Sequence, residues 1–305
     1  MAHHHAHGHP HENNHITKLE NISRAFVVGI VLNTAFVIIE VATGIYTNSL
    51  ALLSDAGHNL SDVAGLGLSL FAFQMAKRKA NDKYTYGYSK STILASLMNA
   101  VILFIAVGSI GWESVQRFIH PVVTQGRVIS IVAAIGIAIN AASAFLFFRD
   151  RKSDINIKGA YLHLAADALV SLGVVIAGIL ITYTGLNWID PAISLVIMLV
   201  VVASTWTVLT ESLRLTLDAV PENVDLEKIS EMIAQKNGVK SIHHVHIWAM
   251  STTKNAMTAH LVIDSALSQT QVADMKHQLK HELEHHNIQH ITLETELECC
   301  EELDC

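Results

Sequence analysis

Six long apolar stretches constrain the fold of this chain more than any other feature of its sequence. A helix that crosses the hydrocarbon core of a bilayer needs about 20 mostly apolar residues. Stretches of this kind lie near residues 25–45, 50–75, 91–115, 127–148, 159–184 and 189–210. Because 51% of the 305 residues are hydrophobic and only 15% are charged, an ordinary soluble fold is excluded. The pattern predicts an α-helical membrane protein with six transmembrane helices.

Lysine and arginine are unevenly distributed among the loops that would join these helices. The loop at 76–90 carries five and the loop at 149–158 carries four, whereas the loops near 45–49 and 185–188 carry none and the loop at 116–126 carries one. Positive residues collect on the cytoplasmic side of a membrane protein. We therefore predict a multi-pass protein of the inner cell membrane with both termini in the cytoplasm.

The N-terminal residues are rich in histidine. Seven of the 19 histidines fall within residues 1–15, in a composition that cannot pack a core. We expect residues 1–17 to form a disordered cytoplasmic tail that attracts metal ions. Interruption of the histidines by Ala, Gly and Pro favours a native tail over an expression tag. The first apolar stretch follows this tail and is not a cleavable signal peptide.

The charge density of the chain changes after residue 210. Residues 18–210 form the predicted membrane domain, and residues 211–297 have the composition of a soluble cytoplasmic domain. The segment 298–305 contains all three cysteines, which should stay reduced and are either soft metal ligands or idle thiols. The net charge of −7 leaves no basic patch, so a nucleic-acid partner is excluded.

The predicted soluble domain has a mixed pattern of helices and strands. Its expected order is helix, strand, strand, helix, strand, over residues 221–238, 241–248, 256–263, 268–286 and 286–297. Gly238 is expected to end the first helix, and Ser268 with Gln271 forms a capping-box pattern before the second. This order predicts an α/β sandwich with its helices on one face of the sheet.

Two histidine–aspartate pairs interrupt the apolar stretches. His58 and Asp62 are four residues apart, and His163 and Asp167 repeat that spacing. In a helix this spacing places both side chains on one face, about 6 Å apart along the axis. Two such helices facing each other supply two imidazole nitrogens and two carboxylates, which suits tetrahedral zinc. A set of oxygen ligands alone would favour harder ions such as manganese.

The alternative is that these groups are hydrogen-bonded polar residues in the core of a helix bundle. An Asp at the centre of a spanning helix costs about 2.5–3.5 kcal/mol on insertion scales. Because this cost recurs with an identical His partner, a functional site is favoured over packing. We expect Asp55 and Asn59 to support the helix, and Glu40 and Asn33 to support or gate the site.

The same four side chains also bind protons. Metal binding requires neutral imidazole and ionised carboxylate, so protons and metal compete for them. Moving two positive charges out of a negative interior costs about 4.6 kcal/mol per 100 mV. These observations lead to the hypothesis that a metal ion is exchanged for one or more protons.

Several stretches together carry a specific resemblance. They are SLALLSDAGHNLSD, ANDKYTYGYSKSTILASLMNA, YLHLAADALVSLGV and WIDPAISL, followed by HHVHIW, AHLVI and HITLETE. From about residue 18 to near its end, the chain resembles the cation diffusion facilitator family. The likeness is strongest to its zinc-exporting branch, with one His–Asp pair on each of the second and fifth helices.

The resemblance implies a homodimer of six-helix protomers, each with a cytoplasmic metallochaperone-like (ferredoxin-like) domain. It implies a zinc/proton antiporter that works by alternating access, with cadmium or cobalt as further substrates. The implied transport ligands are His58, Asp62, His163 and Asp167. A cytoplasmic zinc site, regulatory or structural, is implied at His243, His260 and Glu296. The loop after the second helix has Asp82 as its one acidic residue, which argues against a further metal site there.

The remaining histidines are weaker candidates. On a regular strand, His244 and His246 would share one face and His243 would take the other. His277, His281 and His285 fall on one helix face, which is expected to be solvated rather than a metal site.

Two other functions are compatible with a His- and Asp-rich membrane protein. A membrane metalloenzyme could use His and Asp to activate water, but no additional intramembrane residue is placed as a general base. A metal sensor would need no ligand pairs at membrane depth.

Overall fold

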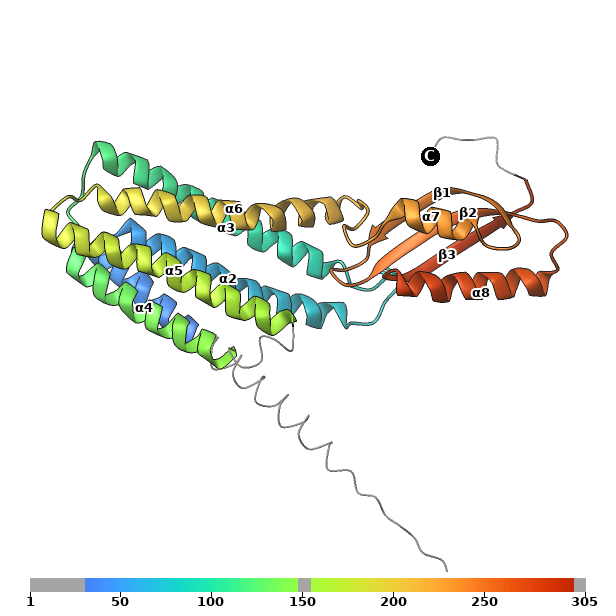
Figure 1. Cartoon of the computed structure of the whole chain (residues 1–305), viewed down its shortest axis with the longest axis horizontal. Helices are drawn as coiled ribbons and strands as arrows, with labels where there is room; N and C mark the ends of the chain where they lie inside the picture. Colours follow the sequence, from blue (N-terminus) through green and yellow to red (C-terminus); the bar gives the residue numbers. More distant parts are fainter. Residues whose placement is uncertain (1–30, 148–154, 299–305) are drawn as a thin grey trace, which may run out of the picture. The chain divides into compact units, whose positions relative to one another are not determined.

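The computed structural model describes residues 31–147 and 155–298, within which side chains are not described at every position (Figure 1). The chain forms two compact units. Among the described residues, one unit holds 31–64, 102–147 and 155–204, and the other holds 65–101 and 205–298.

Helices occupy the described part of each of the six predicted apolar stretches, and the first of them is shorter than the rest. The first described helix is Val31–Thr47. It is followed by α2 (Leu50–Ala76), α3 (Ser91–Ile119), α4 (Gly126–Phe147), α5 (Ile155–Thr184) and α6 (Ile189–Thr216). Within the described residues, α3 to α6 are long and apolar enough to cross a membrane. The predicted helical membrane architecture is confirmed, and α3 and α6 extend beyond the predicted ends at residues 115 and 210.

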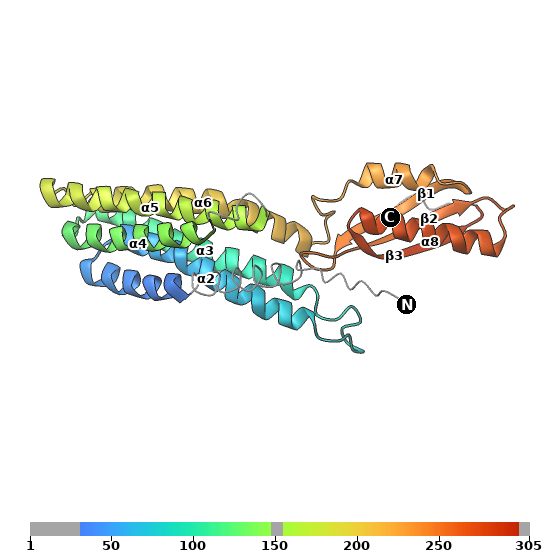
Figure 2. The same ribbon diagram turned by 60° about the horizontal axis from the view of Figure 1, so that its bottom comes forward.

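Small residues bring α4 and α5 close together, and Figures 1 and 2 draw the two helices side by side. A Cβ atom added to Gly178 would lie 2.6 Å from the carbonyl oxygen of Gly126, so a larger residue would force the helices apart. Ser130 Oγ also donates to the carbonyl oxygen of Val175 across this contact, at 3.2 Å. The position of α5, which carries one of the predicted His–Asp pairs, is therefore fixed by close backbone packing.

A buried carboxylate anchors the beginning of α2. Asp190, in the first turn of α6, is fully buried. It accepts hydrogen bonds from Ser49 Oγ at 2.5 Å, from the backbone N–H of Leu50 at 2.7 Å and from that of Ala51 at 3.3 Å. A negative charge at a helix N-terminus satisfies free N–H groups and complements the helix dipole. This contact sets where α2 starts and so where its His–Asp pair lies.

The C-terminal part of the other unit is a three-stranded mixed sheet with two helices. Strands β1 (Val239–Ala249) and β2 (Asn255–Ile263) are antiparallel, and β2 pairs in parallel with β3 (Ile288–Glu296). Helix α7 (Leu226–Ala234) precedes β1, and α8 (Gln269–His285) connects β2 to β3. The predicted order of helix, strand, strand, helix, strand is confirmed.

Both helices pack on the same face of this sheet. Leu261 of β2 belongs to one buried cluster with Ile233 of α7 and Leu279 of α8. The predicted capping box is present, because Gln271 N donates to Ser268 Oγ at 3.3 Å and Ser268 N donates to Gln271 Oε1 at 2.9 Å. Since side chains alternate along a strand, His260 of β2 lies on the face opposite the helices.

Candidate metal sites

The first candidate site joins α2 to α5 inside one compact unit. His58 Nε2 lies 3.2 Å from Asp167 Oδ1 and 3.9 Å from Asp62 Oδ2. One ligand atom from each of these three residues lies within 4.8 Å of the others. We call His58, Asp62 and Asp167 the helix cluster. Asp167 is almost completely buried, with 2% of its side chain exposed, so its carboxylate has little access to water.

The structure brings together three of the four residues predicted for this site. The fourth, His163, lies one turn before Asp167 in α5, and its side chain falls outside the described residues. The spacing of four residues that predicted the pairs is thus realised on two neighbouring helices. His58 and Asp62 from α2 approach Asp167 from α5 across the helix contact.

Polar contacts link α2 to α5 and to the helix Val31–Thr47. Ser171, one turn after Asp167, donates from Oγ to Asp55 Oδ2 at 2.9 Å. Asn59, adjacent to His58, donates from Nδ2 to Glu40 Oε2 at 3.4 Å. Asp55 and Asn59 therefore have contacts of the supporting kind that the sequence predicted. The anchoring of α2 by Asp190 was not predicted, because an Asp in the first turn of a helix is normally read as part of that helix's own N-terminus.

The ligands of the helix cluster suit a divalent cation that binds both nitrogen and oxygen atoms. An imidazole nitrogen and two carboxylate oxygens are ligands that zinc accepts readily. The carboxylates also offset the charge of the ion, which matters where water is scarce. Imidazole nitrogen and carboxylate oxygen accept protons as well as metal ions, so the same geometry can bind either kind of cation.

The second candidate site lies on the sheet face opposite α7 and α8. His243 of β1 is directly paired with His260 of β2. Glu296, at the end of β3, reaches both histidines: its Oε1 lies 2.7 Å from His260 Nδ1 and its Oε2 lies 3.3 Å from His243 Nε2. Glu294 Oε2 lies 3.6 Å from His260 Nε2. The three residues predicted for this site are brought together.

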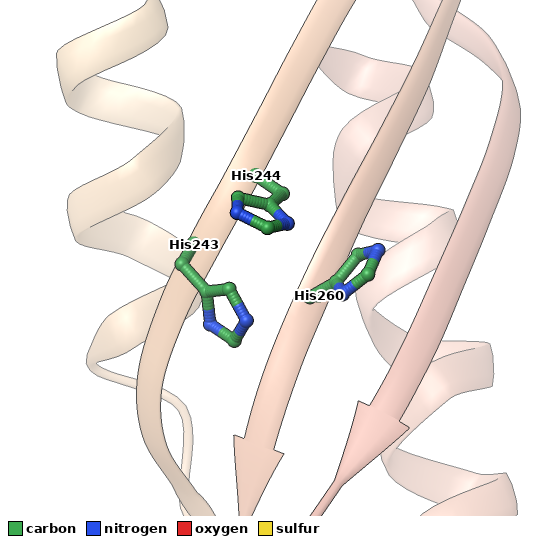
Figure 3. A group of neighbouring side chains, drawn as sticks. All are labelled: His243, His244 and His260. Carbon is green, nitrogen blue, oxygen red and sulfur yellow. The ribbon is translucent and has the colours of Figure 1, made fainter. Parts of the chain in front are cut away.

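His244 joins this site, contrary to the prediction that it faces away from His243. The register of β1 shifts between His243 and His246, and His244 adopts a positive φ of 48°. This β-bulge turns two consecutive side chains to the same face. The ring centroids of His243, His244 and His260 lie 4.9–5.3 Å apart, and Figure 3 shows the rings gathered beside β1 and β2. We call these three histidines and Glu296 the sheet cluster.

A regular-strand pattern could not reveal His244, because one inserted residue reverses the alternation. A positive φ is uncommon for residues other than glycine, although His is enriched among the exceptions. Such backbone strain is typical of functional sites. At least one nitrogen from each of the three rings lies within 4.8 Å of the others, a spacing compatible with a shared metal ion.

Other histidines fall outside these clusters. His277, His281 and His285 are exposed on α8, which confirms the predicted solvated face. The rings of His281 and His285 contact each other, with centroids 5.0 Å apart. The histidine-rich tail and Cys299, Cys300 and Cys305 lie outside the described residues.

Sequence comparisons match nearly the whole chain to one family. Residues 26–216 match the model of the cation efflux transmembrane domain, and residues 221–298 match that of the cation efflux protein cytoplasmic domain. The two matches meet at the start of the soluble domain, close to the change in charge density seen in the sequence.

Characterised relatives align over most of their length. The chain is 37% identical over 279 residues to a cadmium, cobalt and zinc/H⁺-K⁺ antiporter of Bacillus subtilis, covering 90% of this chain and 89% of the relative. It is 37% identical to the metal cation efflux system protein CzcD of Cupriavidus metallidurans, covering 98% of this chain and 92% of the relative. It is 32% identical to the zinc transporter ZitB of Escherichia coli, covering 98% of this chain and 95% of the relative.

These matches place the chain among transporters rather than enzymes. They agree with the four described helices that are long and apolar enough to cross a membrane, and with the grouping of three possible metal ligands from α2 and α5. The chain belongs to the cation efflux family, the membrane transporters also called cation diffusion facilitators, and it has both the transmembrane and the cytoplasmic domain of that family.

Proposed function

We propose that this chain exports Zn²⁺ from the cytoplasm in exchange for protons, binding the ion at His58, Asp62, His163 and Asp167. The observation that supports this most strongly is the helix cluster, in which ligand atoms from two helices lie within 4.8 Å of one another. The names of the relatives, a cadmium, cobalt and zinc/H⁺-K⁺ antiporter and a zinc transporter, agree with it. Cd²⁺ and Co²⁺ are further proposed substrates.

Exchange follows from competition for the same atoms. His58 Nε2 and Asp167 Oδ1 are 3.2 Å apart, a distance at which they can share one proton. A zinc ion needs His58 neutral and both carboxylates ionised. Zinc binding therefore releases protons, and protons that arrive from the opposite side of the membrane displace zinc. Alternating access of the site to the two sides turns this competition into antiport.

The membrane potential opposes the export of Zn²⁺, and exchange for protons lowers this electrical cost. Carrying two positive charges out of a negative interior costs about 4.6 kcal/mol for each 100 mV. Protons that enter during the same cycle reduce the charge moved and contribute the free energy of their own gradient. Uncoupled zinc efflux would have to work against the full electrical cost.

We propose the following arrangement in the cell. Residues 18–210 form the membrane domain of an inner-membrane protein, and residues 211–297 form a cytoplasmic domain through which two copies associate as a homodimer. Both termini are cytoplasmic, so the histidine-rich residues 1–17 and the cysteines in residues 298–305 face the metal pool from which zinc is taken. The loop charges and the family of the cytoplasmic domain support this arrangement.

A second zinc site is proposed in the cytoplasmic domain, at the sheet cluster. Its donors are the imidazoles of His243 and His260 and the carboxylate of Glu296, with His244 as an additional imidazole. Three nitrogens and one carboxylate match the ligands of tetrahedral zinc. Bound zinc would link β1, β2 and β3, because each of these strands supplies a donor. A stabilising role and a regulatory role both follow from such a link.

Transport by purified protein in sealed vesicles tests the proposal. Zinc uptake driven by a pH gradient is measured for the wild type, Asp62→Ala and His163→Ala, with Glu113→Gln as a matched control at an exposed carboxylate. We expect uptake in the wild type and the control and loss of uptake in both cluster variants. A wild type that moves zinc without any pH response would contradict proton exchange. Unchanged flux in both cluster variants would contradict the proposed ligands.

A further inference from the structure

A second group of buried polar side chains lies next to the helix cluster and supplies no proposed zinc ligand. It consists of Glu40, from the helix Val31–Thr47, and Asp55 and Asn59 from α2. All three residues have 0% of their surface exposed. Two complete carboxyl groups are thus enclosed among membrane helices, where an isolated negative charge is very unfavourable. Such burial requires a compensating interaction.

The hydrogen bonds of this group leave several oxygen atoms without a donor. Asn59 Nδ2 donates to Glu40 Oε2 at 3.4 Å, and Ser171 Oγ donates to Asp55 Oδ2 at 2.9 Å. The carboxyl groups of Glu40 and Asp55 lie within hydrogen-bonding reach of each other. Nevertheless, Glu40 Oε1, Asp55 Oδ1 and Asn59 Oδ1 are buried and accept no hydrogen bond from any donor that the described residues provide.

The surrounding charges do not compensate for two carboxylates. Among the described residues, the charged or titratable groups that act on Asp55 are Glu40, His58 and Asp167, and Asp55 is the one that acts on Glu40. No lysine or arginine is among these groups. Two carboxyl groups that share a buried site cannot both ionise without a large cost, because like charges repel and neither is hydrated. One proton between them removes a charge and supplies the missing O–H donor.

We propose that Glu40 and Asp55 share one exchangeable proton, and that this proton dissociates when zinc binds at the helix cluster. This inference rests on the proposed function and extends it, because the pair adds a proton-binding site separate from the zinc ligands. The balance is simple: zinc binds, one O–H bond of the pair breaks, and one proton leaves to water. When zinc departs, the pair takes a proton again.

The contacts of the pair explain how zinc would reach it. Ser171, which donates to Asp55, lies one turn after Asp167 on α5, and Asn59, which donates to Glu40, is adjacent to His58 on α2. A divalent cation at the helix cluster places positive charge near Asp55 and stabilises the ionised pair. Any shift of α5 relative to α2 would also change the hydrogen bond from Ser171, so charge and geometry act together.

Infrared difference spectroscopy of the full-length protein in lipid vesicles tests this directly. A protonated carboxylic acid has a C=O stretching band that a carboxylate lacks. In the wild type we expect such a band to be lost when the pH is raised, and also when zinc is added at constant pH. Both Glu40→Gln and Asp55→Asn should lack this response. They should also release one proton fewer per zinc bound than the wild type.

Three further variants keep the test decisive. Glu40→Asp retains a carboxyl group and should retain the band, which guards against misfolding as the cause of its loss. Glu113→Gln removes an exposed carboxyl group, 51% of which is accessible, and should leave the response unchanged. Asp62→Asn should abolish the response to zinc but retain the response to pH. The pH response therefore tests the pair even if the proposed zinc ligands are wrong.

Three outcomes would contradict a shared, exchangeable proton on Glu40 and Asp55. A wild type with no protonated-carboxyl band would show that the pair is neutralised by something other than a proton, such as a potassium ion. A band that persists when zinc binds would show a permanent structural proton. An unchanged zinc response in both Glu40→Gln and Asp55→Asn would assign the band to other carboxyl groups. Each of these results overturns the proposal.

Discussion

The helix cluster and the sheet cluster use the same ligand types, imidazole and carboxylate, but the helix site has the larger share of carboxylates even when His163 is counted with it. In its described part, the helix cluster has two carboxylates and one imidazole, whereas the sheet cluster has three imidazoles and one carboxylate. The Asp167 side chain is 2% exposed, while those of His243 and His260 are 15% and 28% exposed. The helix set is richer in groups that are negative when deprotonated, and it contains the most buried carboxylate of the two sites, Asp167; His58 and Asp62, at 15% and 31%, are about as exposed as the sheet-cluster residues.

This difference matches two different tasks. A transport site must release its ion, and buried carboxylates help because protonation removes their charge. The helix cluster is also assembled from two separate helices, α2 and α5. The sheet cluster is joined by strand pairing, with His243 directly opposite His260. Ligands held by a hydrogen-bonded sheet favour retention of the ion, so removing a ligand should affect the two sites unequally.

The largest expected contrast is in transport. We expect Asp167→Ala to reduce zinc flux in vesicles by more than about 100-fold. Loss of a residue that only hydrogen-bonds to a metal ligand lowers affinity or activity by about 10–100-fold, and loss of the ligand itself should cost more. Glu296→Ala should change the same flux by less than about tenfold, since the sheet cluster is not on the proposed transport route. Equal losses in the two variants, measured at matched protein content, would abolish the distinction between the clusters.

The next contrast concerns metal selectivity. Replacing His58 and His163 by Asp leaves an all-oxygen set, which favours harder cations. We expect the preference for zinc over manganese to fall about tenfold, equivalent to about 1.4 kcal/mol. The same exchange at His243 and His260 should leave transport selectivity unchanged. Competition between the two metals in vesicle uptake measures the ratio, and an unaltered ratio in the His58 and His163 variant would show that ligand type is not the filter.

Sequence reasoning reached further into the helix cluster than into the sheet cluster for a physical reason. A helix has a fixed period, so four-residue spacing determines that His58 and Asp62 share a face whatever surrounds them. The parallel pairing of β3 with β2 and the bulge at His244 depend on contacts distant in sequence. Alternation along β1 therefore predicted the wrong face for His244 relative to His243. The ligand roles of all these residues remain predictions.

Long-range contacts also explain what the sequence did not reveal around α2. Asp190 lies 140 residues after Leu50 in the sequence, and it accepts a hydrogen bond from the backbone N–H of Leu50. The sequence predicted Asp55 as a support of its helix and Glu40 as a group that supports or gates the site, and it did not relate the two, because they belong to different helices and no spacing rule connects them. Apolar periodicity predicts that helices exist and how long they are. It does not identify which buried polar groups meet between them.

A smaller effect is expected from the anchor of α2. Asp190→Ala removes the acceptor for Ser49 Oγ and for the backbone N–H of Leu50. Loss of such a cap costs up to about 2 kcal/mol of stability. We expect a lower thermal unfolding temperature in detergent and weaker zinc binding at the helix cluster, with binding at the sheet cluster retained. Ser204→Ala, a part-buried hydroxyl on the same helix, is the matched control. Equal weakening of both clusters would indicate general unfolding instead.

The smallest expected effect separates strain from ligation in the sheet cluster. His244 has a φ of 48°, which a residue with a Cβ atom adopts at a cost of about 1–2 kcal/mol. His244→Gly and His244→Ala both remove the imidazole, but only glycine relieves the strain. We expect both variants to bind cytoplasmic zinc more weakly, and the glycine variant to be the more stable one by about 1 kcal/mol. Metal titration and denaturant unfolding of the full chain measure the two quantities. If both variants bound zinc as tightly as the wild type, the bulge would serve strand geometry alone, and the sheet cluster would reduce to His243, His260 and Glu296.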